Sequence, residues 1–158
     1  MQARRTLTAF HAFTDARGFT LIELMVAVAI FGIISAVAYP QYKDYVTRGA
    51  LADASTGLAS IRADMERYYQ DNRSYASING FTTPCAGTGS GVVFGNFTIS
   101  CKGTPTTTAY TLQAVGAKAA AGFTFTIDQN DTRATVAAAS GWTTCATKWL
   151  MKKGAVCS

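Results

Sequence analysis

The stretch RGFTLIELMVAVAIFGIISAVAYPQYKDYV, residues 17–46, decides the fold of this 158-residue chain. From Phe19 to Tyr39 nearly every residue is apolar. A helix of about 20 such residues is about 30 Å long, which is enough to span a lipid bilayer. This stretch therefore predicts a membrane-length apolar helix near the N-terminus.

The charged residues before this helix are mostly basic. They include Arg4, Arg5 and Arg17 against a single acid, Asp15. A basic stretch before an apolar run is typical of a targeting leader whose positive end stays in the cytoplasm. We expect residues 1–18 to be this leader. No small-residue cleavage site ends the apolar run, so a membrane anchor is favoured over an ordinary secretory signal.

Glu23 is an unexpected charge near the start of the apolar helix. A carboxylate inside a membrane helix costs roughly 2.5–3.5 kcal/mol on insertion scales, so it usually has a partner. No other side chain between Phe19 and Tyr42 is charged at neutral pH. Cleavage after Gly18 would create an α-amino group on Phe19, about one helical turn before Glu23. This amine could pair with Glu23 of the same chain or of a neighbouring subunit. The alternative is a plain membrane anchor with an unpaired acid.

The helix is expected to run from about Phe19 to Asp71. Its first half is apolar all round, which suits lipid or a packed helical core, and Pro40 should bend it where that half ends. The second half is amphipathic. Its apolar face comprises Val46, Leu51 (or Ala50), Ala54, Leu58, Ile61, Met65 and Tyr68. Gly49 and Gly57 weaken its intrinsic helicity, so this half needs a sheet to pack on.

Four strand-like runs follow the helix and predict an antiparallel sheet, which gives an α+β fold. They are Val92–Cys101, Ala109–Val115, Phe123–Asp128 and Thr135–Ala139. The first run contains Gly95-Asn96, which predicts an internal turn or a bulge. We expect Tyr68, Tyr69 and Tyr75 to pack the end of the helix against the following loop and the sheet, rather than to form a ligand cluster.

The chain has four cysteines, Cys85, Cys101, Cys145 and Cys157. An even number after a membrane-type N-terminus predicts an oxidising compartment and two disulfides. Three connectivities are possible, of which the local pairs Cys85–Cys101 and Cys145–Cys157 are the simplest. The alternatives are free thiols or a metal site, but the sequence has no C-x-x-C and its only histidine is His11. No metal or cofactor is expected.

The segment Arg17-Gly18-Phe19-Thr20-Leu21-Ile22-Glu23-Leu24 resembles the processing motif of type IV pilins. The match continues through Tyr39-Pro40-Gln41-Tyr42 and Tyr45. The stretch MERYYQDNRSY, residues 65–75, is similar to minor pilins of the PilE type. The resemblance covers residues 17–75 and, beyond them, extends only to the layout. It implies the type IV pilin fold: a long N-terminal helix packed on a four-stranded antiparallel sheet, with a disulfide-bounded C-terminal loop that is commonly exposed and variable.

The resemblance also implies a processing route. A prepilin peptidase in the inner membrane would cut between Gly18 and Phe19, where a larger residue than glycine would not fit, and would N-methylate Phe19. Glu23 would then neutralise the amine of an adjacent subunit during assembly. The 18-residue leader is longer than is usual in this family. Residues 19–44 would form the membrane and filament-core helix, and residues 45–158 the globular pilin domain.

The favoured function is therefore a structural subunit of a type IV pilus, most simply a minor pilin. Its partners would be other pilin subunits, the prepilin peptidase and the inner-membrane assembly machinery. The chain would stand in the inner membrane, with its globular part in the periplasm, before it enters an extracellular pilus. Motility, adhesion and DNA uptake are all functions that such a subunit could support.

The segment bounded by Cys145 and Cys157 carries Lys148, Lys152 and Lys153 beside Trp149. Basic residues interleaved with an aromatic side chain can bind DNA through phosphate contacts and base stacking. Similar pilins include DNA-uptake receptors that use an electropositive stripe. The alternative is a soluble loop in which Trp149 is a buried anchor.

Other function classes are disfavoured. The sequence has no Gly-x-Ser-x-Gly, phosphate-binding or dinucleotide motif, and the acid pairs Asp64/Glu66 and Asp128/Asp131 are interpreted as solvated charges, so an enzyme is not expected. A net charge of +5 is mild for a dedicated nucleic-acid protein. A type II secretion pseudopilin shares the N-terminal motif, but that family often has an acidic calcium-binding C-terminal loop, whereas the loop here is basic.

Overall fold

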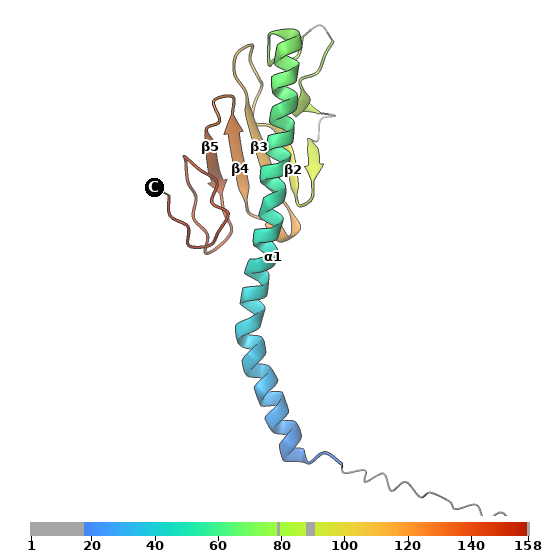
Figure 1. Ribbon diagram of the computed structural model, residues 1–158, viewed down its shortest axis with the longest axis vertical. Helices are drawn as coiled ribbons and strands as arrows, with labels where there is room; N and C mark the ends of the chain where they lie inside the picture. Colours follow the sequence, from blue (N-terminus) through green and yellow to red (C-terminus); the bar gives the residue numbers. More distant parts are fainter. Residues whose placement is uncertain (1–17, 79, 88–90, 158) are drawn as a thin grey trace, which may run out of the picture. The chain divides into compact units, whose positions relative to one another are not determined.

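The computed structural model describes residues 18–78, 80–87 and 91–157. The expected leader lies outside these residues except for Gly18. Helix α1, Leu21–Asn72, is the only α-helix within the described ranges, and it passes through Pro40 without a break (Figure 1). The chain divides at Tyr39/Pro40 into two compact units.

The first unit, over its described residues 18–39, is the start of helix α1. The helix begins two residues later than expected because Thr20 caps it: the Glu23 backbone N–H donates to the Thr20 side-chain oxygen at 3.3 Å. A Thr-x-x-Glu sequence at this position is the signature of a capping box. None of these described residues is buried, and Phe19 is 83% exposed. Helix α1 is thus long and apolar enough to cross a membrane.

The second unit contains the rest of helix α1, and its apolar face confirms the predicted pattern. The buried residues of the helix are Ala50, Leu51, Ala54, Gly57, Leu58, Ile61 and Met65. The prediction was wrong for Val46, which is 38% exposed. Tyr68 is partly buried, and its hydroxyl donates to the carbonyls of Ala76 and Phe81, both at 3.1 Å.

The sheet has five strands in the described residues, not the four predicted. They are β1 Val92–Phe94, β2 Phe97–Cys101, β3 Thr111–Gly116, β4 Thr124–Asp128 and β5 Arg133–Ala137, all antiparallel and in sequence order across the sheet. Gly95-Asn96 forms a full turn, so the expected first strand is a hairpin. Two short 3-10 helices, Pro84–Ala86 and Lys118–Ala120, complete the elements.

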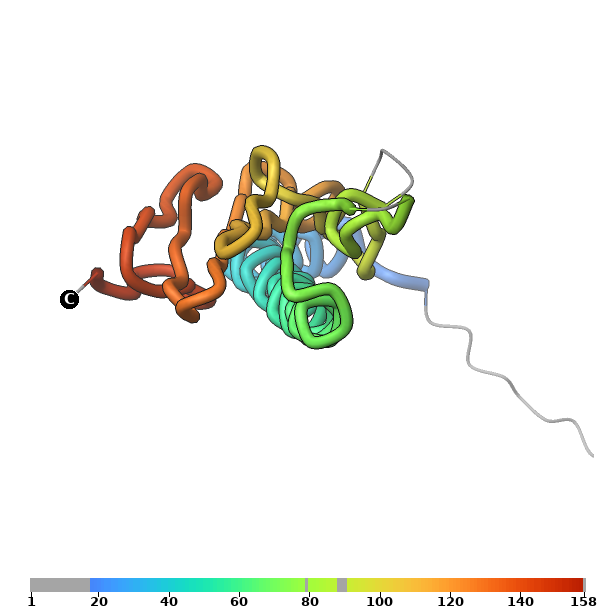
Figure 2. Tube along the Cα trace, turned by 90° about the horizontal axis from the view of Figure 1, so that it is seen from above, coloured from blue at the N-terminus to red at the C-terminus, as the bar shows by residue number. Residues whose placement is uncertain are grey.

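The core lies between the second half of α1 and one face of the sheet (Figure 2). Ile99 on β2 is opposite Ala114 on β3, which is opposite Phe125 on β4, and all three are fully buried. Phe123 and Ile127 are buried with Phe125, and the intervening Thr126 is buried as well, so both faces of β4 are covered at this point. Each large apolar side chain buried in this way contributes roughly 1.5–3 kcal/mol relative to an exposed one.

The tyrosines at the end of the helix pack as expected. Tyr69 stacks on Tyr75 with ring centroids 4.5 Å apart, and Tyr75 meets Tyr110 edge-on at 4.6 Å. Tyr75 and Tyr110 are nearly fully buried. The first loop after the helix is thereby joined to the residue that precedes β3.

Candidate functional site

Two disulfides join the loops to the sheet, in the local pairing. Cys85 is bonded to Cys101, and Cys145 is bonded to Cys157. The second bond encloses residues 146–156, and we call the segment Cys145–Cys157 the C-terminal loop. A disulfide that closes a loop of about this length stabilises a fold by roughly 3 kcal/mol in the chain-entropy model.

A buried hydroxyl, that of Thr135 on β5, organises the C-terminal loop. Thr135 exchanges two backbone hydrogen bonds with Cys145, at 2.7 and 3.0 Å. Its side-chain oxygen donates to the Lys148 carbonyl at 3.0 Å and accepts the Leu150 N–H at 2.8 Å. The sequence identified Thr135 only as a strand residue, because threonine is common in strands and its loop partners lie 13 and 15 residues further along the chain.

Trp149 is an anchor of the loop. Its indole N–H donates to the Thr126 carbonyl on β4 at 2.8 Å, and the Arg133 guanidinium lies over the ring, 4.8 Å from its centroid. A buried indole N–H usually finds such a partner, and the cation covers the negative face of the ring. Trp149 is therefore engaged with the sheet, and phosphate contacts rather than base stacking are the chemistry that the loop can offer.

Three residues of the C-terminal loop, Trp149, Met151 and Lys153, each line a hollow together with residues of helix α1. Trp149 and α1 residues such as Arg62 line a hollow of about 470 Å³. Met151 lines a second hollow, of about 500 Å³, together with Tyr45 and Arg48. Lys153 lines a third hollow, of about 430 Å³, together with Asp44. Residues 149–153 thus run antiparallel to the helix. Leu150, between these positions, is buried.

The predicted basic residues of the loop consequently divide into two sets. Lys153 points toward the helix, and its ammonium lies 3.2 and 3.3 Å from the two carboxylate oxygens of Asp44. Lys152 is exposed and Lys148 is partly buried. The predicted basic residues therefore differ in their exposure, and Lys153 is paired with an acid of helix α1.

Asp131 connects two arginines beside the loop. It lies in the β4–β5 turn with a positive φ of 63°. Its carboxylate accepts from the Arg62 Nη1 and from Arg133, whose Nη2 lies 3.0 Å from Oδ2. Asp131 is thus more than the solvated charge that was predicted. Helix α1, the β4–β5 turn and the C-terminal loop are joined through Arg62, Asp131, Arg133 and Trp149.

Glu66 was also predicted to be a solvated charge, and its contacts contradict that prediction more strongly. Its two carboxylate oxygens accept the hydroxyls of Tyr75 and Tyr110, each at 3.0 Å. Burial, reinforced by these hydrogen bonds to a carboxylate, raises the pKa of Tyr75 to about 12. The same causes raise the pKa of Tyr110 still further. This cluster stabilises the protonated tyrosines and has a structural role.

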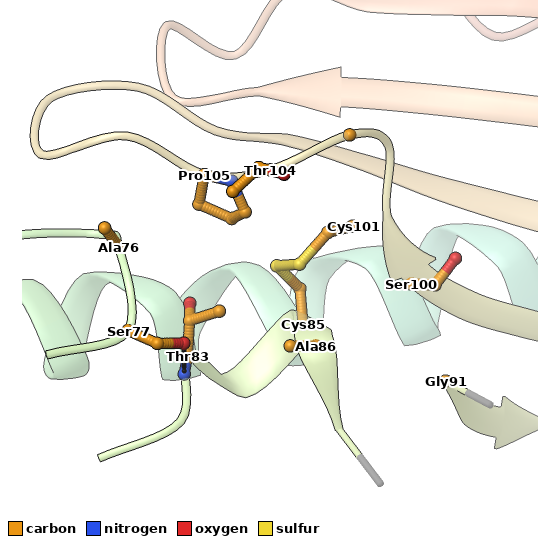
Figure 3. Close-up of a pocket in the computed structure, with 11 residues that line it drawn as sticks. Ala76, Ser77, Thr83, Cys85, Ala86, Gly91, Ser100, Cys101, Thr104 and Pro105 are labelled. Atoms are coloured by element: carbon orange, nitrogen blue, oxygen red, sulfur yellow. Dashed lines mark hydrogen bonds between the residues drawn. A yellow bond between two sulfur atoms is a disulfide. The ribbon is translucent and has the colours of Figure 1, made fainter. Parts of the chain in front are cut away.

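A hollow of about 490 Å³ surrounds the Cys85–Cys101 disulfide (Figure 3). Its described lining residues are small or hydroxylic and include Ser77, Thr83 and Ser100, with no acid, base or histidine. Thr83 is committed to other contacts, since its hydroxyl donates to the Met65 sulfur at 3.2 Å and its N–H donates to the Ser77 hydroxyl at 3.0 Å. This hollow offers no catalytic group.

The C-terminal end of the chain is the basic part. Residues 132–158 contain four basic side chains and no acidic one. Phosphate groups are the ligands that such a surface favours. No group of three or more histidine, cysteine or acidic side chains within the described residues could hold a metal ion.

The predicted processing residues lie at the start of the described chain. Gly18, Phe19 and Glu23 are all exposed. A Cβ at Gly18 would meet no atom within 4 Å, so nothing in the fold itself requires glycine there. Their roles in cleavage, methylation and assembly remain predictions.

Sequence comparisons give two family matches. The family described as "Type IV minor pilin ComP, DNA uptake sequence receptor" matches residues 40–147, and the "Prokaryotic N-terminal methylation motif" matches residues 14–39. The fimbrial protein EcpC of Eikenella corrodens is 33% identical over 100 residues, which are 63% of this chain and 65% of that protein. A type IV major fimbrial protein FimA of Dichelobacter nodosus is 37% identical over 98 residues, 62% of this chain and 58% of that protein.

The matched regions span less than two thirds of the length of these relatives. Among solved structures, the non-core minor pilin PilV of Neisseria meningitidis shares 17% identity and a TM-score of 0.45, over 60% of this chain and 91% of that one. That likeness is too distant to bear on function. The ComP match, in contrast, covers more than half of the residues, and this chain therefore belongs to the type IV minor pilin ComP family.

Proposed function

We propose that this chain is a subunit of a type IV pilus that is made as a membrane-anchored precursor. The apolar first half of α1, with none of its described residues buried, needs lipid or other helices around it. The methylation-motif match supports cleavage between Gly18 and Phe19 by a prepilin peptidase, followed by N-methylation of Phe19. The proposed mature chain is a membrane and filament-core helix, residues 19–44, with a globular domain, residues 45–158, that is periplasmic before assembly and extracellular afterwards.

Assembly would be non-covalent. Contacts between apolar helices supply most of the affinity, and the Phe19 amine of one subunit, placed by the inner-membrane assembly machinery, neutralises Glu23 of the next. The family is one of structural pilins, and we assign the chain no catalytic activity.

We further propose that the chain binds DNA, which favours DNA uptake over motility or adhesion as its task. The observation that carries this proposal is the coincidence of a basic, disulfide-closed loop with a family described as a DNA uptake sequence receptor. The family match ends at residue 147, one residue before the first lysine of the loop. The role of Lys148, Lys152 and Lys153 is therefore argued from their chemistry in this chain.

The proposed contacts are electrostatic. Each phosphate neutralised by a lysine releases condensed counterions, so the logarithm of the binding constant falls with the logarithm of salt concentration by about 0.9 per contact. Three lysines in a short loop would contribute at most about 2.7 to the slope, and less where one of them is paired with an acid of the protein. Arg133, at the foot of the loop, would position Trp149 and with it the loop backbone.

The test is a salt titration of the full chain, in a mild detergent, with a fluorescent DNA duplex. The triple variant Lys148→Ala, Lys152→Ala, Lys153→Ala should bind at least about tenfold more weakly at low salt, with a slope smaller by at most about 2.7. Lys102→Ala, which removes an exposed lysine outside the loop, is the matched control and should change little. No binding at low salt, or equal binding by the triple variant and the wild type, would refute the DNA proposal.

A further inference from the structure

The contact between Lys153 and Asp44 joins residues that are 109 positions apart in the sequence. The lysine belongs to the C-terminal loop and the aspartate to helix α1. Both side chains are partly open to water, with 48% and 35% of their surfaces exposed. The ammonium is within hydrogen-bond distance of both carboxylate oxygens. A lysine of the basic loop is therefore paired with an acid of the same chain.

The structure around Lys153 holds its side chain in this orientation. A Cβ at Gly141 would lie 3.3 Å from the Lys153 Cε, so the bare glycine leaves room for the lysine stem. Gly141 has a φ of +79°, a conformation that favours glycine for a second reason. The same hollow is lined by Trp142 and Phe123. The lysine stem lines this hollow beside Gly141 while its charged end reaches Asp44.

We propose that the Asp44 carboxylate competes with DNA phosphate for the Lys153 ammonium and so limits the affinity of the C-terminal loop for DNA. The proposal rests on the proposed DNA binding and concerns the regulation of that same surface. A carboxylate and a phosphate offer the same kind of anionic oxygen to an ammonium group. An exposed ion pair contributes little to stability, so a phosphate can replace the carboxylate without disturbing the fold.

Asp44 suits this role better than Asp131, the other acid near the loop. Asp131 accepts from two arginines and lies in a left-handed turn, so its removal would disturb the β4–β5 connection. Asp44 has an ion pair with a single lysine of the loop. Removing its charge leaves Lys43 and Lys153 as the charged side chains that line the hollow, with no acid among the lining residues.

The experiment is a double-mutant cycle in the full chain, in mild detergent, with a fluorescent DNA duplex at several salt concentrations. Asp44→Asn should raise affinity about threefold to tenfold at low salt and steepen the salt slope by about 0.9, the value for one added phosphate contact. Lys153→Ala should abolish this gain, and it should weaken binding more in the Asp44→Asn background than in the wild type. Thermal unfolding should show that Asp44→Asn leaves the fold intact.

The control for net charge is Asp64→Asn, which removes an exposed acid that pairs with Arg67 on the same helix. Equal gains from Asp44→Asn and Asp64→Asn, or a gain from Asp44→Asn that survives Lys153→Ala, would overturn the competition and leave the DNA proposal standing. If neither the wild type nor Asp44→Asn binds duplex at low salt, the DNA proposal fails and the competition fails with it.

Discussion

Replacing Gly57 by alanine should destabilise the globular unit, although the same change at Gly49 should stabilise it. Both glycines lie in helix α1. A Cβ at Gly57 would lie 2.8 Å from the Phe94 Cγ and 2.9 Å from its Cβ, whereas a Cβ at Gly49 would meet nothing within 4 Å. The Phe94 Cβ is fixed by the backbone of β1, so rotation of the side chain cannot relieve this clash.

The magnitude follows from two opposing terms. Alanine in place of glycine inside a helix gains about 1 kcal/mol, at either position. Overpacking a tight core contact costs about 1–3 kcal/mol. The β1–β2 hairpin cannot easily move away from the helix, because the Asp53 carboxylate accepts the Asn96 backbone N–H at 3.0 Å and its side-chain amide at 3.1 Å. The net expectation is a loss of up to about 2 kcal/mol for Gly57→Ala, against a gain of about 0.5–1 kcal/mol for Gly49→Ala.

The assay is urea unfolding of the full chain in mild detergent, followed by the fluorescence of Trp142 and Trp149, both of which lie in the globular unit. The midpoint should fall for Gly57→Ala and rise for Gly49→Ala, with unchanged slopes. Equal stabilisation by the two substitutions would refute the close packing of β1 on the helix.

Two further predictions concern charged groups. Stability should fall as the pH rises from about 10 toward 12, because Tyr75 and Tyr110 ionise near the ordinary pKa of 10.0 when unfolded but remain protonated when folded. Urea unfolding between pH 8 and 11 measures this, and a Tyr75→Phe variant with an unchanged pH dependence would contradict it. Glu23→Gln keeps a side chain suited to the Thr20 cap but removes the charge. We expect it to be cleaved normally yet missing from sheared pili on immunoblots, and wild-type incorporation would disprove the assembly role of Glu23.

The amphipathic face of helix α1 could be predicted from the sequence because a 3.6-residue period is a local property. The exception was Val46, which continues the pattern but is exposed. Periodicity indicates which face is apolar, but it does not indicate where the sheet that covers that face begins.

The sheet shows the same division. Gly95-Asn96 was identified as a turn or a bulge, and the contact of Asn96 with Asp53, 43 residues away, fixes a turn. Local sequence patterns do not indicate a partner at such a distance along the chain. The hairpin therefore added a fifth strand that sequence patterns counted as part of the first.

The sequence predicts only the outline of the candidate site. Four cysteines and a cluster of lysines indicated a disulfide-closed basic loop, because those signals depend on composition and spacing alone. Trp149 was considered for base stacking, but Arg133 and the Thr126 carbonyl engage its ring and its N–H. Thr135, which organises the loop from within β5, carried almost no signal.

By itself, the sequence determined the apolar helix, its lone acid at Glu23, the amphipathic face and the basic character of the C-terminal loop. Each of these features depends on residues that are close together in the sequence. The tertiary structure alone decided which lysine of the loop faces an acid, since Asp44 and Lys153 are 109 residues apart and meet only when the loop lies along the helix. Long-range pairs of charges are fixed by packing, and packing is not encoded in any single stretch of chain.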